Sequence, residues 1–236
     1  MTAEGGRELA AIVAARNEAD VILATLAALR RALPGAALWV ADDASTDGTG
    51  EAAIAAGAQL VTRRRPHGKG ANVTAAVRAA LAVEPGPELV LLCDADLGPT
   101  AAELGALVQA VEGGECDLAI AAFRNRAGGG FGLAVGFARW AIERRCGFRA
   151  RAPLSGQRAM RADVLRAALP LAPGFGMETG MTIDAVRAGF RVAEVELELA
   201  HRATGRTPAG FAHRARQLLD AARASGSRRD RGSGKQ

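Results

Sequence analysis

The chain has 236 residues, of which 49% are hydrophobic and 23% charged, a composition that excludes a disordered chain. No segment reaches the ~18 uninterrupted apolar residues of a membrane-spanning helix. The first residues show neither the basic start nor the apolar core of a signal peptide. The three cysteines form no Cys-x-x-Cys pair, which fits a reducing compartment. We therefore expect a cytoplasmic protein.

The net charge of +5 is concentrated at the end of the chain. Residues 201–236 hold nine basic and two acidic residues, a net charge of +7, whereas residues 1–200 hold 21 basic and 23 acidic residues, a net charge of −2. Such a basic end attracts phosphate groups or an anionic membrane surface, so peripheral contact with the inner membrane face is one interpretation. The other is a solubilising, disordered tail, which the Ser-, Gly- and Arg-rich composition of residues 225–236 favours.

An apolar run over residues 9–15 predicts the first strand, followed by a polar turn and a helix whose apolar residues recur near helical spacing up to Leu33. A dinucleotide-binding fold would place Gly-x-Gly-x-x-Gly after this strand, and a sugar-nucleotide pyrophosphorylase would place a glycine-rich basic loop there. The turn from Arg16 to Asp20 contains neither pattern. Both classes therefore lose support.

Residues 37–41 predict the second strand, which runs directly into Asp42 and Asp43. In nucleotide-binding folds, a carboxylate at the tip of this strand commonly binds a ribose hydroxyl or a base N–H. Later residues of the same loop suffice to cap the next helix, so no structural reason accounts for these two carboxylates. We expect them to contact a nucleotide.

Residues 58–62 predict the third strand, before a basic loop and an alanine-rich helix over residues 71–83. Gly68, Lys69 and Gly70 stand at the start of that helix. Glycines beside a lysine at a helix start suit a phosphate, which backbone N–H groups and the helix dipole would hold. The residues alone support an ordinary basic turn equally well, and the spacing differs from that of a Walker A loop.

Residues 89–93 are apolar without interruption and predict a strand buried on both faces. The strand ends in Asp94 and Asp96, and positions i and i+2 of an extended segment point the same way. Both carboxylates would then project from the carboxyl end of a central strand, where α/β sheets bind ligands. Two such oxygen donors suit Mg²⁺ or Mn²⁺ together with a substrate phosphate, and a plain polar loop is the alternative.

The rest of the chain continues the alternation of helices and strands. The patterns predict a helix over 101–112 capped by Thr100, a strand over 117–122, a helix over 133–146 with Trp140 packed on its apolar face, a short strand ending at Arg161, a helix opening near Gly174, a half-exposed edge strand over 191–199 and an amphipathic helix over about 211–224. This alternation indicates an α/β fold with a largely parallel sheet.

Four short motifs occur in one order: Ala15–Glu18, Asp42–Thr49, Gly68–Gly70 and Asp94–Asp96. Together they resemble the nucleotide-sugar half of family 2 glycosyltransferases, which have the GT-A fold. Three later features look like the polyprenyl-phosphate mannosyl- and glucosyltransferase branch of that family: Leu154–Arg158, Glu178 and His201–Arg206. The resemblance implies one Rossmann-like domain over residues 1–224 with helices on both faces of its sheet, a nucleotide-sugar half over about 9–122, an acceptor half over about 123–224, and a disordered tail over 225–236.

The resemblance also implies a role for each matching residue. The nucleotide base and ribose would contact four residues: Arg16, Glu18, Asp42 and Asp43. Lys69 would lie near the diphosphate, and Gln157 would contact substrate. Asp96 would ligate Mg²⁺ or Mn²⁺ directly, Asp94 would contact the ribose or metal-bound water, and His201 would add a further metal ligand. Arg202 and Arg206 would neutralise the leaving diphosphate.

The implied reaction moves a sugar from a nucleotide-diphosphate sugar to an acceptor oxygen. A hydroxyl acceptor needs a carboxylate base such as Glu178, whereas a phosphate acceptor is already an anion. Many relatives carry an acidic doublet where this chain has Glu178 and Thr179. This difference favours a phosphorylated acceptor, such as a polyprenyl phosphate or phosphoglycerate.

Two other functions stay open from the sequence. A sugar-phosphate nucleotidyltransferase would release pyrophosphate rather than a nucleoside diphosphate, and a non-catalytic module would bind a nucleotide without turnover. Nucleic acid is not expected as a partner, because the paired carboxylates repel it and the basic tail lacks interleaved aromatic residues.

Overall fold

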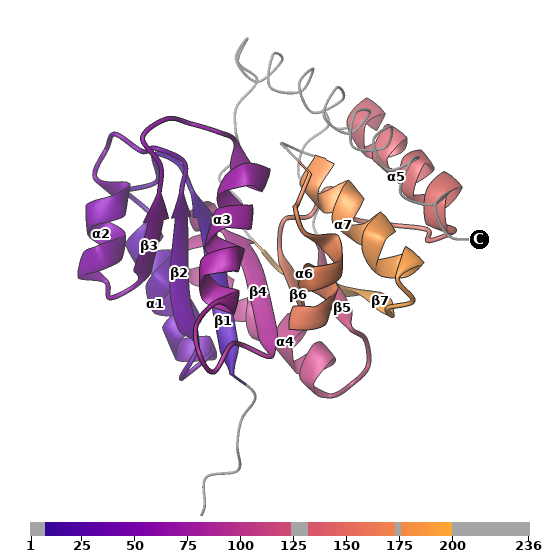
Figure 1. Ribbon diagram of the computed structural model, residues 1–236, viewed down its shortest axis with the longest axis horizontal. Helices are drawn as coiled ribbons and strands as arrows, with labels where there is room; N and C mark the ends of the chain where they lie inside the picture. The colour runs from indigo at the N-terminus through magenta and orange to yellow at the C-terminus, as the bar shows by residue number, and fades with distance from the viewer. Residues whose placement is uncertain (1–7, 124–131, 173–175, 200–236) are drawn as a thin grey trace, which may run out of the picture.

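The computed structural model describes residues 8–123, 132–172 and 176–199. Its centre is a seven-stranded sheet with the order β3-β2-β1-β4-β6-β5-β7, covered by helices on both faces (Figure 1). The strands are β1 (Leu9–Ala15), β2 (Ala37–Asp42), β3 (Gln59–Thr62), β4 (Leu89–Asp94), β5 (Leu118–Phe123), β6 (Arg158–Arg161) and β7 (Val192–Leu197). The helices are α1 (Ile22–Ala32), α2 (Thr49–Ala55), α3 (Lys69–Leu81), the 3₁₀ segment η1 (Ala95–Leu104), α4 (Gly105–Glu112), α5 (Gly132–Cys146), α6 (Ala162–Ala168) and α7 (Gly176–Arg187).

The sheet is mostly parallel, which confirms the predicted fold class. Strands β1 to β4 pair in parallel, as do β5 and β7. Strand β6 lies antiparallel between β4 and β5, so its first residue, Arg158, stands opposite both Leu92 and Ile120. The half-exposed strand expected near the end of the chain is β7, at the edge of the sheet.

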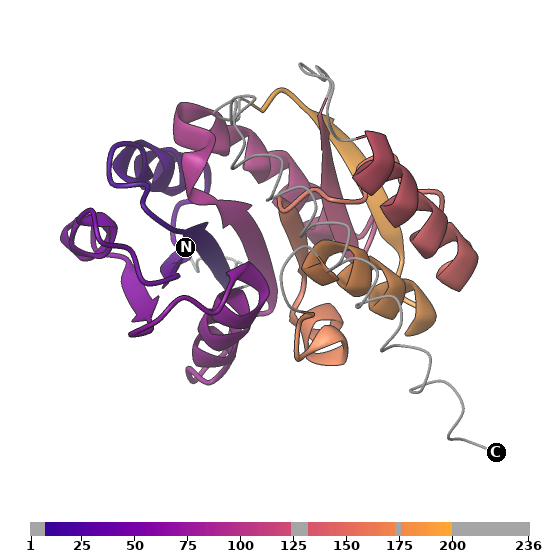
Figure 2. The ribbon, with the colours of Figure 1, turned by 90° about the horizontal axis from the view of Figure 1, so that it is seen from above.

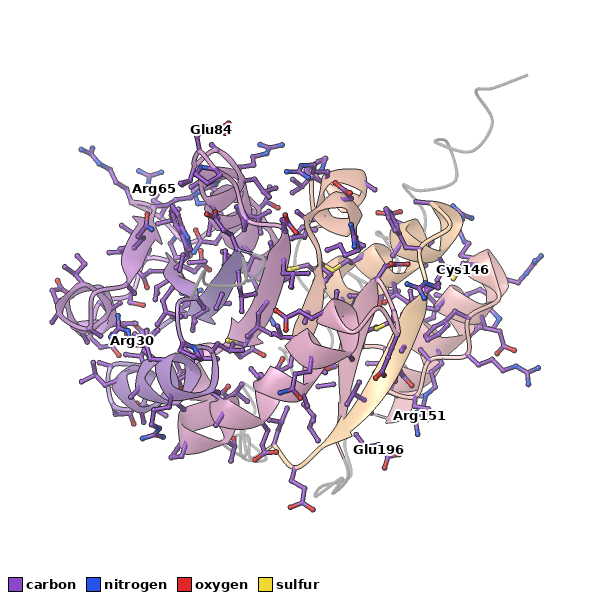
Figure 3. All side chains as sticks on the ribbon, turned by 90° about the horizontal axis from the view of Figure 1, so that it is seen from below. Arg30, Arg65, Glu84, Cys146, Arg151 and Glu196 are labelled. Atoms are coloured by element: carbon purple, nitrogen blue, oxygen red, sulfur yellow. The ribbon has the colours of Figure 1, made fainter. Side chains whose placement is uncertain are left out.

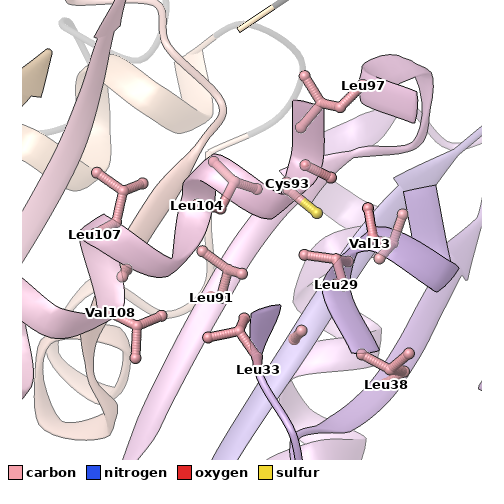
Figure 4. Packing of buried hydrophobic residues seen from close by; sticks show 14 of the residues in the cluster. Val13, Leu29, Leu33, Leu38, Leu91, Cys93, Leu97, Leu104, Leu107 and Val108 are labelled. Carbon is pink, nitrogen blue, oxygen red and sulfur yellow. The ribbon is translucent and has the colours of Figure 1, made fainter. Parts of the chain in front are cut away.

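The core consists of two layers, one on each face of the sheet. Alternate residues of β1 point to opposite faces, as in any strand: Ala11 and Val13 pack under α1, η1 and α4 (Figure 4), and Ala10 and Ile12 pack under α3, α6 and α7. The short apolar runs predicted as strands are therefore buried on both sides. The sheet thus becomes a rigid base for the loops at its carboxyl edge.

Helix α5 forms an additional outer layer next to α7 (Figure 2). Ile142 of α5 packs on Ile183 of α7. The loop after α5 is tied to the edge strand β7, because Arg151 donates to the carboxylates of Glu194 at 3.1 Å and Glu196 at 2.8 Å (Figure 3). No helix in the described part of the chain is long and apolar enough to cross a bilayer.

Three predicted details are wrong. The helix expected over 101–112 starts at Gly105, because Gly98 has a positive φ of 54° and the preceding residues form 3₁₀ turns. Thr100 does not cap it, since its hydroxyl donates to the carbonyl of Leu97 at 2.7 Å. Trp140 does not pack inside, because its residue is 59% exposed.

Candidate active site

The predicted site residues gather where the parallel strands end. The register places Ala15 opposite Asp42 and Ala14 opposite Asp94, so the last residues of β1, β2 and β4 lie side by side. The chain leaves β1 towards β2 on one side, and β4 lies on the other side. Such a switch point is where open α/β sheets bind ligands. The structure therefore brings the motifs after these three strands together at one edge.

The loops after β1 and β2 are joined by hydrogen bonds. Asn17, whose φ is 55°, receives a hydrogen bond from the Thr46 N–H at its side-chain oxygen and donates its own N–H to the Ser45 hydroxyl, both at 2.9 Å. Asn is one of the few residues that adopts this left-handed conformation readily. The Glu18 N–H donates to the Thr49 hydroxyl at 2.9 Å. Arg16 and Glu18 are thereby fixed beside the β2 loop.

Asp42 and Asp43 have internal partners, so the expectation that nothing structural accounts for them is wrong. Asp42 is buried and accepts hydrogen bonds from Ser45 and from the Thr62 hydroxyl. Asp43 accepts the N–H groups of His67 at 2.8 Å and Gly68 at 3.1 Å. These carboxylates shape two loops whose role in nucleotide binding stays a prediction.

Two features next to these carboxylates fit a nucleoside. A hollow of about 200 Å³ lies beside Asp42, lined by Gly50 and Thr62 among others. On the other side, the Arg16 guanidinium lies 3.7 Å from Asp43 Oδ2. The edge of the sheet near β2 thus offers both space and polar groups.

Lys69 joins two carboxylates that come from different elements, strand β4 and helix α7. Its Nζ lies 2.7 Å from Asp94 Oδ1 at the end of β4 and 3.1 Å from Glu178 Oε1 in the first turn of α7. The Glu178 side chain is only 3% exposed, whereas those of Lys69 and Asp94 are 29% and 28% exposed. A cation between two carboxylates is therefore the centre of the site.

The ammonium group of Lys69 is strongly held in its charged form. Burial opposes the charge, but Asp94 and Glu178 outweigh this effect and raise the pKa of Lys69 above its usual range. The Lys69 Nζ thus carries a full positive charge near neutral pH. A cation fixed at a helix start beside glycines is suited to an anionic ligand such as a diphosphate.

The segment before β6 closes over this cluster. Gln157 Nε2 donates to Asp94 Oδ2 at 3.2 Å. A Cβ on Gly156 would lie 2.5 Å from Lys69 Nζ and 3.0 Å from Asp94 Oδ2. Because only glycine leaves this cluster in its present arrangement, Gly156 belongs to the site, although its motif alone predicts no separate role for it.

A second cation, Arg158, is fully buried beneath the site. Its Nε donates to the Ser155 carbonyl at 2.8 Å and its Nη1 to the Thr182 hydroxyl at 3.0 Å. Thr182 in turn donates to the backbone carbonyl of Glu178 at 3.0 Å. Burial lowers the pKa of Arg158 to about 10, so it stays charged at neutral pH. Arg158 thus connects the loop of Gly156 to the helix of Glu178.

Several buried polar atoms around the cluster lack a hydrogen-bond partner within the described residues. They include Glu178 Oε2, Thr179 Oγ1, Ser155 Oγ and the side-chain amide of Asn72 on α3. Buried polar groups in folded proteins are rarely left unpaired. They lie on α3, on α7 and in the loop before β6, which together form the cluster, as expected of a binding site for a polar ligand.

The metal assignment rests on Asp94 and Asp96. Strand β4 ends at Asp94, and Asp96 lies in the first turn of η1, so the extended geometry assumed for the pair is wrong. The buried Thr25 hydroxyl fixes this turn instead, donating to the Ala95 carbonyl at 2.6 Å and accepting the Gly98 N–H at 2.8 Å. The close approach of the Lys69 ammonium shows that Asp94 attracts a cation.

No group of three potential metal-binding side chains occurs among the residues that the structure describes. Magnesium sites commonly use one or two carboxylates and complete their shell with water and substrate phosphate, so Asp94 and Asp96 fit such a site. Three of the predicted residues, His201, Arg202 and Arg206, lie outside the described residues.

Comparison with known proteins assigns the family. The model of Glycosyl transferase family 2 matches residues 10–158. An undecaprenyl-phosphate mannosyltransferase of Micrococcus luteus is 30% identical over 216 residues, which cover 82% of this chain and 84% of the relative. The chain belongs to glycosyltransferase family 2. As a family 2 enzyme it is a glycosyltransferase, as the motifs predicted.

Solved structures of a glycosyltransferase from Mycobacterium tuberculosis support the same conclusion. Glucosyl-3-phosphoglycerate synthase bound to phosphoglyceric acid matches with a TM-score of 0.75 and 28% identity, covering 94% of this chain and 81% of that one. The same synthase with Mn²⁺, uridine diphosphate and glucosyl-3-phosphoglycerate matches with a TM-score of 0.74, 28% identity and the same coverage. The GT-A fold expected for this family 2 enzyme is thereby confirmed.

Proposed function

We propose that this enzyme transfers a sugar from a nucleotide-diphosphate sugar to a phosphorylated acceptor, in a reaction that depends on Mg²⁺ or Mn²⁺. The observation that carries the proposal is the cluster of Asp94, Lys69 and Glu178 at the carboxyl end of β4. It provides a fixed positive charge for a diphosphate, carboxylate oxygens for a cation, and a junction between the donor and acceptor halves of the chain.

The donor would lie along the edge formed by β1, β2 and β4. Arg16, Glu18 and the two carboxylates of the β2 loop would contact the base and ribose. Lys69 would bind the diphosphate, and Asp96 with Asp94 would hold Mg²⁺ or Mn²⁺, which neutralises charge on the diphosphate when bound. The M. tuberculosis synthase has been solved with Mn²⁺ and with Mg²⁺, each together with uridine diphosphate, which supports this assignment.

Charge stabilisation is the main work of the described residues. As the bond from the anomeric carbon to the diphosphate breaks, negative charge grows on the leaving group, and a preorganised cation such as Lys69 lowers the energy of that state. Arg202 and Arg206 would act on the same charge. Lys69 would then move from two carboxylates towards the diphosphate.

The ion pair between Glu178 and Lys69 favours a phosphate acceptor. One of its oxygens is bonded to the Lys69 ammonium, and an ion-paired carboxylate is a poor base for a hydroxyl. A phosphate oxygen attacks without losing a proton. Relatives whose names specify undecaprenyl phosphate and 3-phosphoglycerate support this class of acceptor.

Calorimetry with a panel of nucleoside diphosphates and Mn²⁺ tests the donor site. We expect binding that requires the metal and that Asp96→Asn abolishes, while the variant keeps the unfolding temperature of the wild type. A folded Asp96→Asn protein with unchanged metal-dependent binding and turnover would contradict the metal assignment. Release of pyrophosphate instead of a nucleoside diphosphate would identify a nucleotidyltransferase, and binding without turnover on any acceptor would identify a binding module.

Asp43→Ala tests the nucleotide contact. We expect the free energy of nucleotide binding to weaken by about 1–3 kcal/mol, because the base or ribose group that Asp43 would bind loses its hydrogen-bond partner. Asp43 also holds the His67 and Gly68 N–H groups, so the unfolding free energy is measured in parallel. Equal nucleotide affinity in variant and wild type would show that Asp43 is only structural.

A further inference from the structure

Helix α5 has two apolar faces, and only one of them is buried. The inner face, which packs towards α7, consists of Ala134, Ala138, Ala141 and Ile142. The spacing of four other residues, i, i+4, i+7 and i+11, puts them together on another side of the helix. We call Leu133, Phe137, Trp140 and Arg144 the outer stripe.

The outer stripe is strongly exposed for an apolar surface. Leu133 is 82% exposed and Trp140 is 59% exposed. The ring of Phe137, which is half-buried, lies 5.6 Å from that of Trp140, so the two aromatic residues form one contact pair within the stripe. The other large apolar residues that are exposed in the described part of the chain, Leu23, Ile54 and Val83, lie on three different segments. Single exposed residues are normal, whereas a contiguous patch marks an interaction surface.

The outer stripe begins at the end of the molecule that carries the site. Arg187 at the end of α7 donates its Nε to the Arg145 carbonyl at the end of α5, at 3.2 Å. The two helices lie side by side and run in the same direction (Figure 1). Leu133 at the start of α5 is therefore at the same end as Glu178 at the start of α7. A surface that touches the stripe is close to the proposed acceptor site.

We propose that the outer stripe of α5 docks on an anionic lipid bilayer and so delivers a lipid phosphate to the site. This inference rests on the proposed phosphorylated acceptor and names its lipid form. Trp side chains favour the boundary between lipid and water, where an apolar ring and a polar N–H are both satisfied. Arg144 continues the stripe with a charge that no carboxylate pairs within the described residues, and it would meet lipid phosphates.

Charge argues against two other occupants. Helix α5 carries three arginines and one glutamate, so an anionic partner is favoured. The segment over 211–224 also has apolar residues at helical spacing, but it holds three arginines and one aspartate and would repel α5. A second copy of the chain would bring two Arg144 side chains together. A bilayer of anionic lipids supplies both the apolar layer and the opposite charge.

Tryptophan fluorescence tests the inference directly. The chain has no tyrosine and two tryptophans, of which Trp39 is buried in β2 and Trp140 lies in the stripe. Trp39→Phe leaves Trp140 as the single reporter. We expect vesicles of phosphatidylglycerol and phosphatidylcholine to shift its emission to shorter wavelength, brominated acyl chains to quench it, and pure phosphatidylcholine vesicles to do neither. If Trp39→Phe unfolds, the difference between wild type and Trp140→Phe gives the same signal.

A pair of surface variants distinguishes vesicle binding through the outer stripe from non-specific binding to vesicles. Leu133→Ser combined with Phe137→Ser removes two apolar anchors, and we expect co-sedimentation with the anionic vesicles to fall by about tenfold or more. The matched control is Val83→Ser just after α3, a residue that is 45% exposed and lies outside the stripe, and it should bind vesicles as the wild type does. Both proteins should keep the nucleotide affinity of the wild type.

Three results would overturn the inference. The first is unchanged Trp140 emission with anionic vesicles. The second is a Trp140 side chain that is already shielded from water in the free protein and becomes exposed when residues 211–236 are removed. That result would show that this segment covers the outer stripe. The third is shielding that depends on protein concentration, which would indicate a second copy. Failure of the proposed function can be distinguished from failure of this inference. If anionic vesicles change the Trp140 emission but the enzyme does not turn over a polyprenyl phosphate, bilayer docking stands and only the lipid-phosphate acceptor is refuted.

Discussion

At the scale of single residues, Lys69 determines how the two halves of the chain meet. Its ammonium group contacts carboxylates from both β4 and α7. The Gly-Lys-Gly motif suits a phosphate site, because a helix start beside glycine favours anions, but it suits an ordinary basic turn equally well. It gave no sign of Glu178 as a partner, since 109 residues separate the two along the chain.

We expect Lys69→Met to lower both stability and activity. The change leaves the buried Glu178 without its cation, and breaking a buried pair costs about 3–5 kcal/mol. Because Lys69 is partly exposed, we expect a loss of about 1–3 kcal/mol in the free energy of unfolding, measured by urea denaturation. Turnover should fall by at least about a hundredfold if the charge acts on the diphosphate. Lys69→Arg, which keeps the charge, should recover the stability. Unchanged turnover in Lys69→Met would refute the role.

Gly156→Ala should impair the site more than the fold. The added Cβ would lie 2.5 Å from Lys69 Nζ and displace a flexible side-chain end, so the free energy of unfolding should change by less than about 1 kcal/mol while nucleotide affinity falls. Gly136→Ala is the matched control, since a Cβ there meets nothing within 4 Å and the helix gains a better helix former. Equal nucleotide affinity in both variants would show that nucleotide binding tolerates a displacement of the Lys69 ammonium group.

At the scale of elements, the sequence predicted the strands well and the helix surfaces less well. Uninterrupted apolar runs such as residues 89–93 allow only a buried strand. Helix α5 is different, because alanines cover one face and larger apolar residues the other. Sequence spacing does not distinguish which face meets the body, and the prediction that Trp140 packs inside is therefore wrong. The late start of α4 follows from the contact between Thr25 and Gly98, which no local pattern reveals.

Strand β6 carries a buried charge whose role is testable. Arg158→Met keeps the side-chain volume and removes a desolvated cation, so we expect the free energy of unfolding to change by no more than about 2 kcal/mol. The links from Arg158 to Ser155 and Thr182 would be lost, and with them the fixed distance between Gly156 and Glu178. We expect kcat to fall by about tenfold or more with little change in donor KM. A variant with normal kcat would make Arg158 a packing residue only.

At the scale of the whole molecule, the alternation of strands and helices was sufficient to predict one α/β domain and the edge where its motifs meet. The antiparallel position of β6 between β4 and β5 was not predictable. A strand of four residues that follows a turn at Pro153 and Leu154 can join any free edge. Which edge it joins depends on the long loop and helix α5 that precede it.

Removal of residues 211–236 should separate the site from the membrane. The deleted segment carries seven basic residues, six arginines and Lys235, and two aspartates. We expect the shortened protein to keep its nucleotide affinity and unfolding temperature, while its affinity for anionic vesicles falls because about 1 kcal/mol per basic residue near the surface is lost. Calorimetry and co-sedimentation at low salt measure the two quantities. A large loss of nucleotide affinity would instead make this segment part of the donor site.

The central position of β6 also sets the order of events during synthesis. When β1 to β4 have left the ribosome, the free edge of β4 must wait until residues 158–161 emerge. At roughly 5–20 residues per second, this wait lasts several seconds. An open strand edge pairs with whatever strand it meets. A nascent chain halted before Arg158 should therefore bind chaperones or aggregate, and one extended beyond Arg161 should be released from both.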